Sequence, residues 1–237
     1  MRLQKSTGNC LYQERILLYM DYDSVPLRDF KELNDWETVI FVYQSALKQV
    51  ETKIDILNGE FQHRHKYNPI EHVKSRIKTP ESIVKKLKRH GYESSIENMV
   101  RYVNDIAGIR ISCSFTSDIY LIADMISKQN DLTILARRDY MKNPKKSGYR
   151  SYHMLVTTPV FLSDSIIDTK VEIQIRTVAQ DFWATLEHKM HYKFEGDGPD
   201  YITKELRECA RYVAELDTRM EELNNEIQKY GKLSDKK

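Results

Sequence analysis

Two acidic residues on or beside expected strands are the positions in this sequence best suited to chemistry. From Val171 to Arg176 apolar and polar residues alternate strictly, which is the pattern of a half-buried strand. Glu172, Gln174 and Arg176 then stand in a row on one face, about 7 Å apart. The second acid, Asp105, lies where the chain enters another strand-like segment. An acid, an amide and a base on one face make a suitable floor for a polar ligand, although the solvated outer face of a sheet gives the same pattern.

Two segments rich in Lys and Arg predict an anionic partner. Residues 63–90 contain nine Lys or Arg against two Glu, and residues 137–150 contain six against one Asp, whereas the net charge of the chain is only +2. Such segments favour a nucleotide, a nucleic acid or an acidic lipid, and solvated helix faces are the plainer alternative. The second segment includes the basic loop (residues 141–148, MKNPKKSG), which is followed by Tyr149, an aromatic ring suited to stack on a base.

Together these residue types match what phosphoryl-type transfer requires. Magnesium binds one or two carboxylates together with phosphate oxygens, so Asp105 and Glu172 are the candidate ligands. Lys and Arg neutralise the charge that moves to the leaving group, and a carboxylate beside the attacking hydroxyl can take its proton. The two acids speak against simple phosphate binding, because they would repel a phosphate unless a cation lay between them.

A basic helix after Thr79 is the clearest local signal among the elements that must position these residues. Thr79 suits the N-cap, Pro80 the first helical position, and Gly91 the end of the helix. Free N–H groups and the positive end of the helix dipole lie at such a start. Three neighbouring side chains make this start a predicted anion site: Arg76, Lys78 and Ser82.

The remaining periodicity predicts a mixed β-sheet flanked by helices, an α+β fold. One long amphipathic helix is expected over 34–61, capped by Asn34 or Asp35 and ended by Gly59. Further helices are expected at 95–104, 117–128 (capped by Ser117 or Asp118), 177–193 (capped by Thr177) and 201–230. Strands are expected at 76–78, 105–115, 131–138, 149–158 and 171–176, with 164–169 as the connection into the last of them.

Composition and length fit one globular domain. The chain has 237 residues, of which 41% are hydrophobic and 30% charged, and its longest apolar run falls short of the roughly 18 residues of a membrane span. A signal-peptide core is not visible, and three cysteines at long spacings form neither a CxxC motif nor a disulfide framework. We therefore expect a cytoplasmic, reduced protein. The expected parts are an N-terminal arm (1–30), a single domain (31–230) with its core at 68–193 and flanking helices at 34–61 and 200–230, and a tail (231–237).

Five short motifs between Asn68 and Lys193 resemble the synthetase domain of the (p)ppGpp synthetases, whereas no P-loop, GxSxG or HExxH motif is present. The five are Arg76-x-Lys78-x-x-x-Ser82-Ile83, Asn104-Asp105-Ile106-Ala107-Gly108-Ile109-Arg110, Lys146-Ser147-Gly148-Tyr149-Arg150-Ser151-Tyr152-His153, Glu172-Ile173-Gln174-Ile175-Arg176-Thr177, and Asp181-Phe182-Trp183-Ala184 with Glu187-His188. Each is weak alone, and the five in this order are specific. In length the chain is similar to a small alarmone synthetase of the bacterial type, nearest to the RelP branch. It lacks the His-Asp pair of the hydrolase domain that larger relatives carry.

The resemblance implies a reaction in which pyrophosphate moves from ATP to the 3′-hydroxyl of GDP or GTP and AMP is released. Asp105 and Glu172 would bind Mg²⁺, and Glu172 would also activate the 3′-hydroxyl. On the ATP side, Arg76 and Arg110 would hold the adenine. The ATP phosphates would meet a set of polar and basic residues: Lys78, Ser82, Lys86 and Arg89. The GDP or GTP side would be lined by Lys146 at the 5′-phosphates, Tyr149 stacked on guanine, and His153, Gln174 and Asp181.

Asp181 departs from some relatives, which have Asn at this position. Asp only accepts hydrogen bonds, although it still suits the N–H groups of guanine. The resemblance also implies a homotetramer assembled through the terminal helices. The apolar stripes at 36–61 and 201–230 suit that assembly, and burial in the core of one chain would use the same stripes.

Two other functions fit parts of the pattern. An RNA-binding module would use the basic segments and Tyr149, and would have no need of Asp105 and Glu172. A nucleotidyltransferase of the polymerase-β type would release pyrophosphate rather than AMP. RNA or a nucleotide is also a candidate effector of the enzyme.

Overall fold

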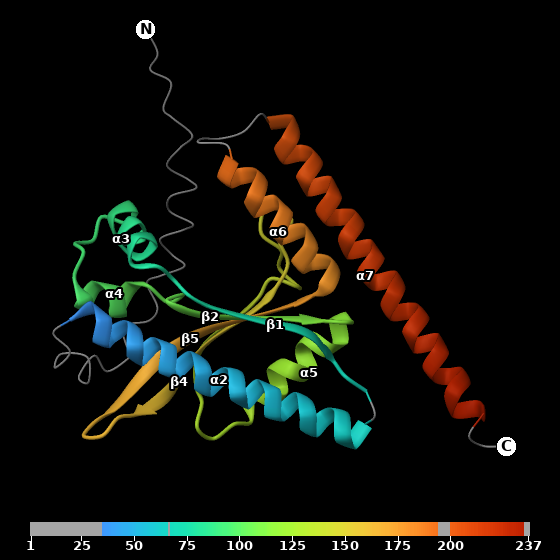
Figure 1. The fold of residues 1–237 in the computed structure, drawn as a ribbon. Helices are drawn as coiled ribbons and strands as arrows, with labels where there is room; N and C mark the ends of the chain where they lie inside the picture. Colours follow the sequence, from blue (N-terminus) through green and yellow to red (C-terminus); the bar gives the residue numbers. More distant parts are fainter. Residues whose placement is uncertain (1–34, 66, 194–199, 235–237) are drawn as a thin grey trace, which may run out of the picture.

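A mixed five-stranded sheet with helices around it forms the body of the protein (Figure 1). The structure, a computed structural model, describes residues 35–65, 67–193 and 200–234, so the expected arm at 1–30 lies outside the described residues. The strand order is β1-β2-β5-β4-β3; β2 and β5 run parallel, and the other neighbouring pairs are antiparallel. The predicted α+β class is confirmed. In chain order the elements are α2 (Trp36–His65), β1 (Ile70–Ile77), α3 (Pro80–Arg89), α4 (Ile96–Tyr102), β2 (Ala107–Cys113), α5 (Thr116–Ser127), β3 (Thr133–Asp139), β4 (Tyr152–Phe161), β5 (Ile166–Thr177), α6 (Val178–Lys193) and α7 (Asp200–Ser234).

The main apolar core lies between the sheet and two helices, α2 and α5. Helix α2 contacts β1, β2, β4 and β5, and α5 contacts β2 and β5. On the central strand β5, Val171, Ile173 and Ile175 are fully buried in this core. Because successive side chains of a strand point to opposite faces, the polar residues of β5 face the other side of the sheet, where α6 stands in Figure 1.

The alternation predicted for 171–176 is therefore confirmed, and the alternative of a solvated outer face is wrong. Glu172 and Gln174 are half-buried, and Arg176 is only 3% exposed. The strand is longer than predicted, because it begins at Ile166 and its first residues pair with β4. The connection expected at 164–169 is correspondingly short, and a hydrogen bond from Leu162 N to Ser165 O at 2.9 Å closes it.

Helix α2 begins as predicted and ends later than predicted. Asp35 accepts hydrogen bonds from the backbone N–H and the hydroxyl of Thr38, so it is the N-cap. The helix passes Gly59 and continues to His65. A Cβ at Gly59 would meet no other atom within 4 Å, so this glycine weakens an exposed turn by about 1 kcal/mol without breaking it. Three basic residues in the last turn favour the extension through the helix dipole.

Strand β1 spans Ile70–Ile77, where only 76–78 was expected as strand. Most of its side chains are exposed and do not alternate, because β1 is at the edge of the sheet and pairs only with β2. Charged side chains are common on such edges, since they discourage pairing with a second molecule. Period two therefore fails as a signal for this strand.

Capping residues fix the starts of the shorter helices. The Thr79 hydroxyl accepts from Ser82 N at 3.4 Å, and Ser95 caps α4 in the same way. Gly91 has φ +79°, as the end of α3 requires. Helix α5 starts at Thr116, before either predicted cap, because Asp118 accepts from the backbone of Phe115 instead of serving as the cap itself.

Helices α6 and α7 pack side by side and leave two apolar stripes exposed (Figure 1). Thr177 caps α6 as predicted, since its hydroxyl accepts from Gln180 N at 3.1 Å. Helix α7 continues to Ser234, into the expected tail. The exposed stripes are made of Val178, Phe182, Leu186 and Met190 on α6 and Leu216, Met220, Leu223 and Ile227 on α7. Among the described residues, no helix has both the length and the apolar character needed to cross a membrane.

Candidate active site

A cavity of about 190 Å³ lies on the polar face of the sheet, over β1, β2 and β5. The strand register explains which side chains meet there. Arg76, Gly108 and Glu172 occupy one row across the three strands, and Lys74, Arg110 and Gln174 occupy the next row on the same face. Gly108 leaves the middle of the first row without a side chain. Asp105 joins the lining from the segment before β2, so both predicted acids share one cavity with both predicted adenine-binding arginines.

Two lysines hold the carboxylate of Asp105. Lys78 follows β1 and Lys86 lies on α3, and their Nζ atoms are 2.8 Å and 2.7 Å from the two carboxylate oxygens. The backbone N–H of Lys78 also donates to Ile106 O at 2.8 Å, which ties the ends of β1 and β2 together. Burial alone would raise the pKa of Asp105, but Lys86 and Lys78 outweigh burial and lower the pKa to about 2. Asp105 is therefore ionised throughout the physiological pH range.

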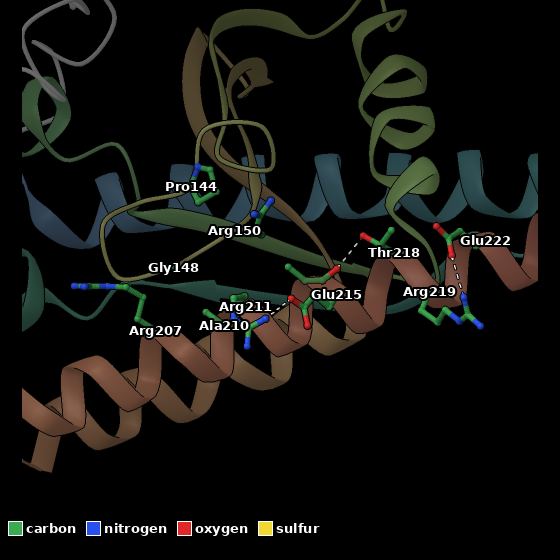
Figure 2. A pocket seen from close by; sticks show the side chains of 11 residues that line it. Pro144, Gly148, Arg150, Arg207, Ala210, Arg211, Glu215, Thr218, Arg219 and Glu222 are labelled. Atoms are coloured by element: carbon green, nitrogen blue, oxygen red, sulfur yellow. Dashed lines mark hydrogen bonds and ion pairs between the residues drawn. The ribbon is translucent and has the colours of Figure 1, made fainter.

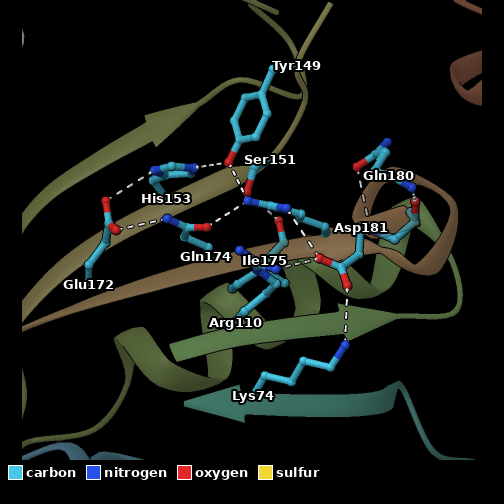
Figure 3. A network of polar contacts seen from close by, with 12 residues as sticks. Lys74, Arg110, Tyr149, Ser151, His153, Glu172, Gln174, Ile175, Gln180 and Asp181 are labelled. Atoms are coloured by element: carbon cyan, nitrogen blue, oxygen red, sulfur yellow. Dashed lines mark hydrogen bonds and ion pairs between the residues drawn. The ribbon is translucent and has the colours of Figure 1, made fainter. Parts of the chain in front are cut away.

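A closed ring of polar contacts surrounds Glu172 (Figure 3), in which four links are hydrogen bonds and the fifth is a contact between His153 and Glu172. Gln174 donates to Glu172 at 2.9 Å, and Arg176 donates to Gln174 at 2.7 Å. In the other direction, Arg176 donates to the Tyr149 hydroxyl at 2.7 Å, that hydroxyl meets His153 Nε2 at 2.8 Å, and His153 Nδ1 lies 3.5 Å from Glu172 Oε1. The ring joins β5 to β4 and to the end of the basic loop. It holds Glu172, His153, Gln174 and Tyr149 in one polar network.

Burial decides the ionisation of His153, and hydrogen bonding decides that of Glu172. The pKa of His153 is lowered because the ring is buried, against the opposing effect of Glu172. Burial would raise the pKa of Glu172, but bonding to His153 reverses the direction and lowers it. At neutral pH His153 is therefore uncharged, with Nδ1–H directed to Glu172 and Nε2 accepting from Tyr149. Glu172 is a carboxylate under the same conditions.

Asp181 lies in the first turn of α6 and joins the two sides of the site. Arg110 and Arg176 each place Nη1 3.3 Å from Asp181 Oδ1, and Lys74 Nζ is 3.9 Å from Oδ2 (Figure 3). Arg110 was predicted on the ATP side and Asp181 on the GDP or GTP side, so the structure pairs residues that were assigned to different substrates. Among the described residues, the buried Nε–H groups of Arg110 and Arg176 have no hydrogen-bond partner, which favours an additional acceptor from a ligand.

Eight predicted residues lie outside the cavity lining, and three of them, Ser82, Arg89 and Lys146, are exposed. The other five are half-buried or buried: Lys78, Lys86, Tyr149, His153 and Asp181. Ser82 is in the first turn of α3, where its N–H is bound to the cap Thr79, and its side chain is exposed. Arg89 is the last residue of α3 and is exposed. Lys146 is exposed on the basic loop. These three exposed residues can meet only the parts of a ligand that extend beyond the cavity.

Two further residues of the site, Lys74 and Lys170, were not predicted as part of it, and Arg176 was predicted on the face of Glu172 without a role of its own. Arg176 closes the ring of polar contacts, and Lys74 lines the cavity beside Arg110. Lys170 precedes Glu172 by two residues, and its buried Nζ donates to Asn104 Oδ1 at 2.6 Å and to Arg101 O at 3.2 Å. Period two places Arg176 and Lys170 on the face of Glu172. Lys74 shares the face of Arg76, but the side chains of β1 do not alternate in burial, so periodicity did not indicate Lys74.

Comparison with known proteins places this geometry among nucleotide enzymes. Residues 75–197 match the family described as a region found in RelA/SpoT proteins. The chain is 44% identical over 209 residues to the GTP pyrophosphokinase YwaC of Bacillus subtilis, a match that covers 88% of this chain and 100% of that protein.

Solved structures give the same picture. The crystal structure of small alarmone synthetase 2 from Bacillus subtilis superposes with a TM-score of 0.74 at 44% identity, covering 81% of this chain and 99% of the other. Small alarmone synthetase 1 from the same organism, solved with its product pppGpp, gives 0.76 at 34% identity, with coverages of 81% and 98%. Its complex with AMPCPP gives 0.71 at 32% identity, with coverages of 82% and 98%.

Proposed function

Because the chain belongs to the RelA/SpoT family, we propose that it is a small alarmone synthetase, which transfers pyrophosphate from ATP to the 3′-hydroxyl of GDP or GTP and releases AMP. The observation that carries this proposal is the convergence of Asp105 and Glu172 on one cavity with Arg76 and Arg110. Two ionised acids beside cations suit a polyphosphate that brings its own metal ion, and they do not suit a bare RNA backbone. The relative that carries pppGpp as its product supports the same reaction.

The ATP side of the site is formed by β1, β2 and α3. Arg76 and Arg110 lie on adjacent strands at the cavity, where their planar guanidinium groups suit the two faces of adenine. Cations for the phosphates come from Lys78 and Lys86 at Asp105, with Ser82 and Arg89 farther along α3. The start of α3 adds the positive end of its dipole.

The GDP or GTP side is formed by the basic loop, β4, β5 and α6. Tyr149 would stack on guanine, and Lys146 would meet the 5′-phosphates. His153 and Gln174 hold the ring that orients Glu172, so they position the acceptor sugar next to this carboxylate. Asp181 is the proposed acceptor for guanine N–H groups, and it pairs with Arg110 and Arg176.

The transfer step needs one base and a set of fixed charges. The 3′-oxygen attacks the β-phosphorus of ATP while its proton passes to Glu172. The bond from the β-phosphorus to the oxygen that bridges to the α-phosphate breaks, and AMP leaves with that oxygen. Lys78 and Lys86 then face the charge that accumulates on the leaving group.

The two acids fit a magnesium ion. No group of three His, Cys, Asp or Glu side chains suited to a metal is found in residues 35–65, 67–193 and 200–234. A pair of ionised carboxylates completed by phosphate oxygens and water is the usual arrangement for Mg²⁺, so Asp105 and Glu172 are the proposed ligands. The bound ion would draw charge from the phosphates and lower the barrier to attack.

The exposed stripes of α6 and α7 support assembly into a homotetramer. On α2, Tyr43, Leu47 and Val50 are buried against the sheet, whereas Phe41 and Ile56 are 55% and 65% exposed. Phe182 is 64% exposed and Ile227 is 66% exposed, which is unusual for large apolar residues on neighbouring helices. The basic segments at 63–90 and 137–150 further support a nucleotide or RNA effector.

Labelled ATP tests the reaction. The protein is incubated with Mg²⁺, ATP labelled in the γ-phosphate, and GDP or GTP. We expect the label in a guanosine tetra- or pentaphosphate and unlabelled AMP as the other product. Release of ADP would instead indicate transfer of a single phosphoryl group, and release of pyrophosphate would indicate nucleotidyl transfer. Either result would overturn the proposal.

A further inference from the structure

Helix α7 makes a close contact with the basic loop at Gly148. This glycine has φ +91°, a conformation that residues with a side chain rarely adopt. A Cβ placed on it would lie 2.5 Å from the Cβ of Ala210 on α7, well inside van der Waals contact. Both partners must therefore be small, so residues 62 positions apart in the sequence constrain each other.

Figure 2 shows Gly148 of the basic loop next to Arg207 and Ala210 of α7, and a hydrogen bond and an apolar cluster reinforce this contact. Arg207 lies one turn before Ala210 and donates from Nε to the carbonyl oxygen of Lys146 at 2.9 Å. Ala210 is buried with Trp183 and Ala184 of α6, and the ring of Tyr149 packs against the same cluster. The helix thus holds the loop at its backbone on either side of Gly148 and supports the aromatic ring that follows.

Helix α7 is itself fixed to the rest of the protein. The carboxylate of Asp217 accepts from the Thr177 hydroxyl and from the Gln180 amide, both at 2.7 Å. Trp183 Nε1 donates to Leu206 O at 2.9 Å, and Glu221 accepts from Ser117 N at 3.1 Å. Because α7 is anchored to α6 and to the start of α5, it provides a rigid support for the basic loop.

We propose that Ala210 and Arg207 are positioning residues for the acceptor nucleotide. They hold the basic loop so that Lys146 and Tyr149 face GDP or GTP, although neither residue touches the reacting atoms. This inference rests on the proposed function, since it assigns the loop to the acceptor. Substitutions on α7 should therefore change the affinity for GDP or GTP. They should leave the affinity for ATP unchanged, because the ATP side is formed by β1, β2 and α3.

The test compares equal substitutions one turn apart on α7. Ala210→Leu adds a side chain against Gly148, whereas Ala214→Leu adds the same side chain one turn farther along the helix, at a residue that is not among the nearest neighbours of a Cβ on Gly148. Calorimetry measures binding of GDP and of a non-hydrolysable ATP analogue to each protein. We expect Ala210→Leu to weaken GDP binding about tenfold or more, the worth of one lost stacking contact, with binding of the ATP analogue unchanged. Ala214→Leu should leave both unchanged.

A second pair of variants covers the case in which Ala210→Leu disturbs folding. Arg207 is exposed, so Arg207→Ala removes the hydrogen bond to Lys146 without touching the core. Arg211→Ala is its control, because Arg211 pairs with Glu208 and Glu215 on its own helix. Arg207→Ala should weaken GDP binding in the same direction as Ala210→Leu, and Arg211→Ala should not.

Hydrogen exchange separates failure of this inference from failure of the proposed function. Within the loop, Gly148 N donates to Lys145 O at 2.8 Å and Lys145 N donates to Tyr149 O at 3.1 Å. These two amides should exchange faster in Ala210→Leu and in Arg207→Ala, whatever reaction the protein catalyses. Unchanged exchange together with unchanged GDP affinity in both variants would overturn the inference, even if the wild-type protein makes the expected product.

Discussion

The imidazole of His153 places Nδ1 3.5 Å from Oε1 of Glu172. On its other side, Nε2 of the same ring meets the Tyr149 hydroxyl at 2.8 Å. Since burial lowers the pKa of His153, the ring is neutral at pH 7 and can donate from one nitrogen while accepting at the other. Glu172 therefore keeps its negative charge beside a neutral partner, as a general base requires.

Glu172→Gln should abolish most of the activity without unfolding the protein. The amide keeps the shape and can accept from one of the two donors, His153 or Gln174, but it cannot take a proton. We expect the rate of AMP formation from ATP and GDP to fall about 10²- to 10⁴-fold, the usual contribution of a general base. Glu60→Gln, at an exposed position on α2, is the control and should keep full activity. A Glu172→Gln protein that still works at a near-normal rate would exclude this residue as the base.

Lys86→Met should move the acid limb of the activity profile to higher pH. Lys86 is the first of the two lysines that lower the pKa of Asp105 to about 2, and without it burial raises that pKa again. Losing a charge-assisted hydrogen bond should raise the KM for ATP about tenfold or more. The measurement is kcat/KM for ATP between about pH 4.5 and pH 8. Lys85→Met, on the exposed side of α3, is the matched control, and equal profiles for the two variants would contradict the role of Lys86.

Stability should rise with pH more steeply in the wild-type protein than in Lys170→Met. Burial lowers the pKa of Lys170 to about 7, whereas an unfolded lysine titrates near its ordinary value of 10.5. Between these two pH values the unfolded chain binds more protons than the folded one, so the free energy of unfolding increases with pH, by up to about 1.4 kcal/mol per pH unit for one group. Below pH 7 Lys170 is protonated in both the folded and the unfolded state, so the free-energy cost of burying its charge is present in full.

Denaturant unfolding from pH 7 to pH 9 measures this slope. In Lys170→Met, the slope of the unfolding free energy against pH should be smaller by the amount that Lys170 contributes. Lys85→Met should keep the wild-type slope. If Lys170→Met and the wild-type protein gave parallel curves, Lys170 would titrate normally in the folded state.

Arg176→Met should lower both stability and acceptor binding. The side chain is buried, and it bonds to Asp181, Gln174 and Tyr149. Removing one partner of a buried charged pair costs about 3–5 kcal/mol of unfolding free energy. GDP binding should weaken, because Tyr149 and Gln174 lose a shared donor, and binding of an ATP analogue should change less. Arg176→Lys should not restore GDP binding, since one ammonium group cannot reach all three partners. Full rescue by lysine would show that charge alone matters.

Phe182→Glu should break the proposed tetramer. Phe182 lies at the centre of the exposed stripe of α6, and a charge there would be buried in an interface between chains. Phe161→Glu is a matched control, because Phe161 is 67% exposed and lies at the β4–β5 hairpin, away from that stripe. Native mass spectrometry should report a smaller assembly for Phe182→Glu alone. An unchanged mass would exclude the α6 stripe from the interface.

Local signals in the sequence were enough for much of the site. The alternation around Glu172, the cap at Thr79 and the turn at Gly91 each depend on a few neighbouring residues, and each is confirmed. The end of α2 was mispredicted, because an exposed glycine only weakens a helix whose other face is buried.

The features that could not be predicted from the sequence depend on contacts between segments that are far apart in the chain. Periodicity indicated that Arg176 shares a face with Glu172, but its bonds to Tyr149 and Asp181 depend on how β4 and α6 pack. Similarly, the stripes of α2 and α6 have the same period, although one is buried and the other exposed. A repeat of three or four marks an apolar face without specifying what covers it.

The contact between Gly148 and Ala210 has a consequence for how such enzymes diverge. The matched family region ends at residue 197, and Ala210 lies beyond it, on a helix that carries none of the five motifs. Changes along α7 would thus alter the affinity for the acceptor nucleotide while the strands that hold Asp105 and Glu172 remain as they are. Residue 210 is therefore a position where chains with the same five motifs could be tuned separately from their catalytic strands.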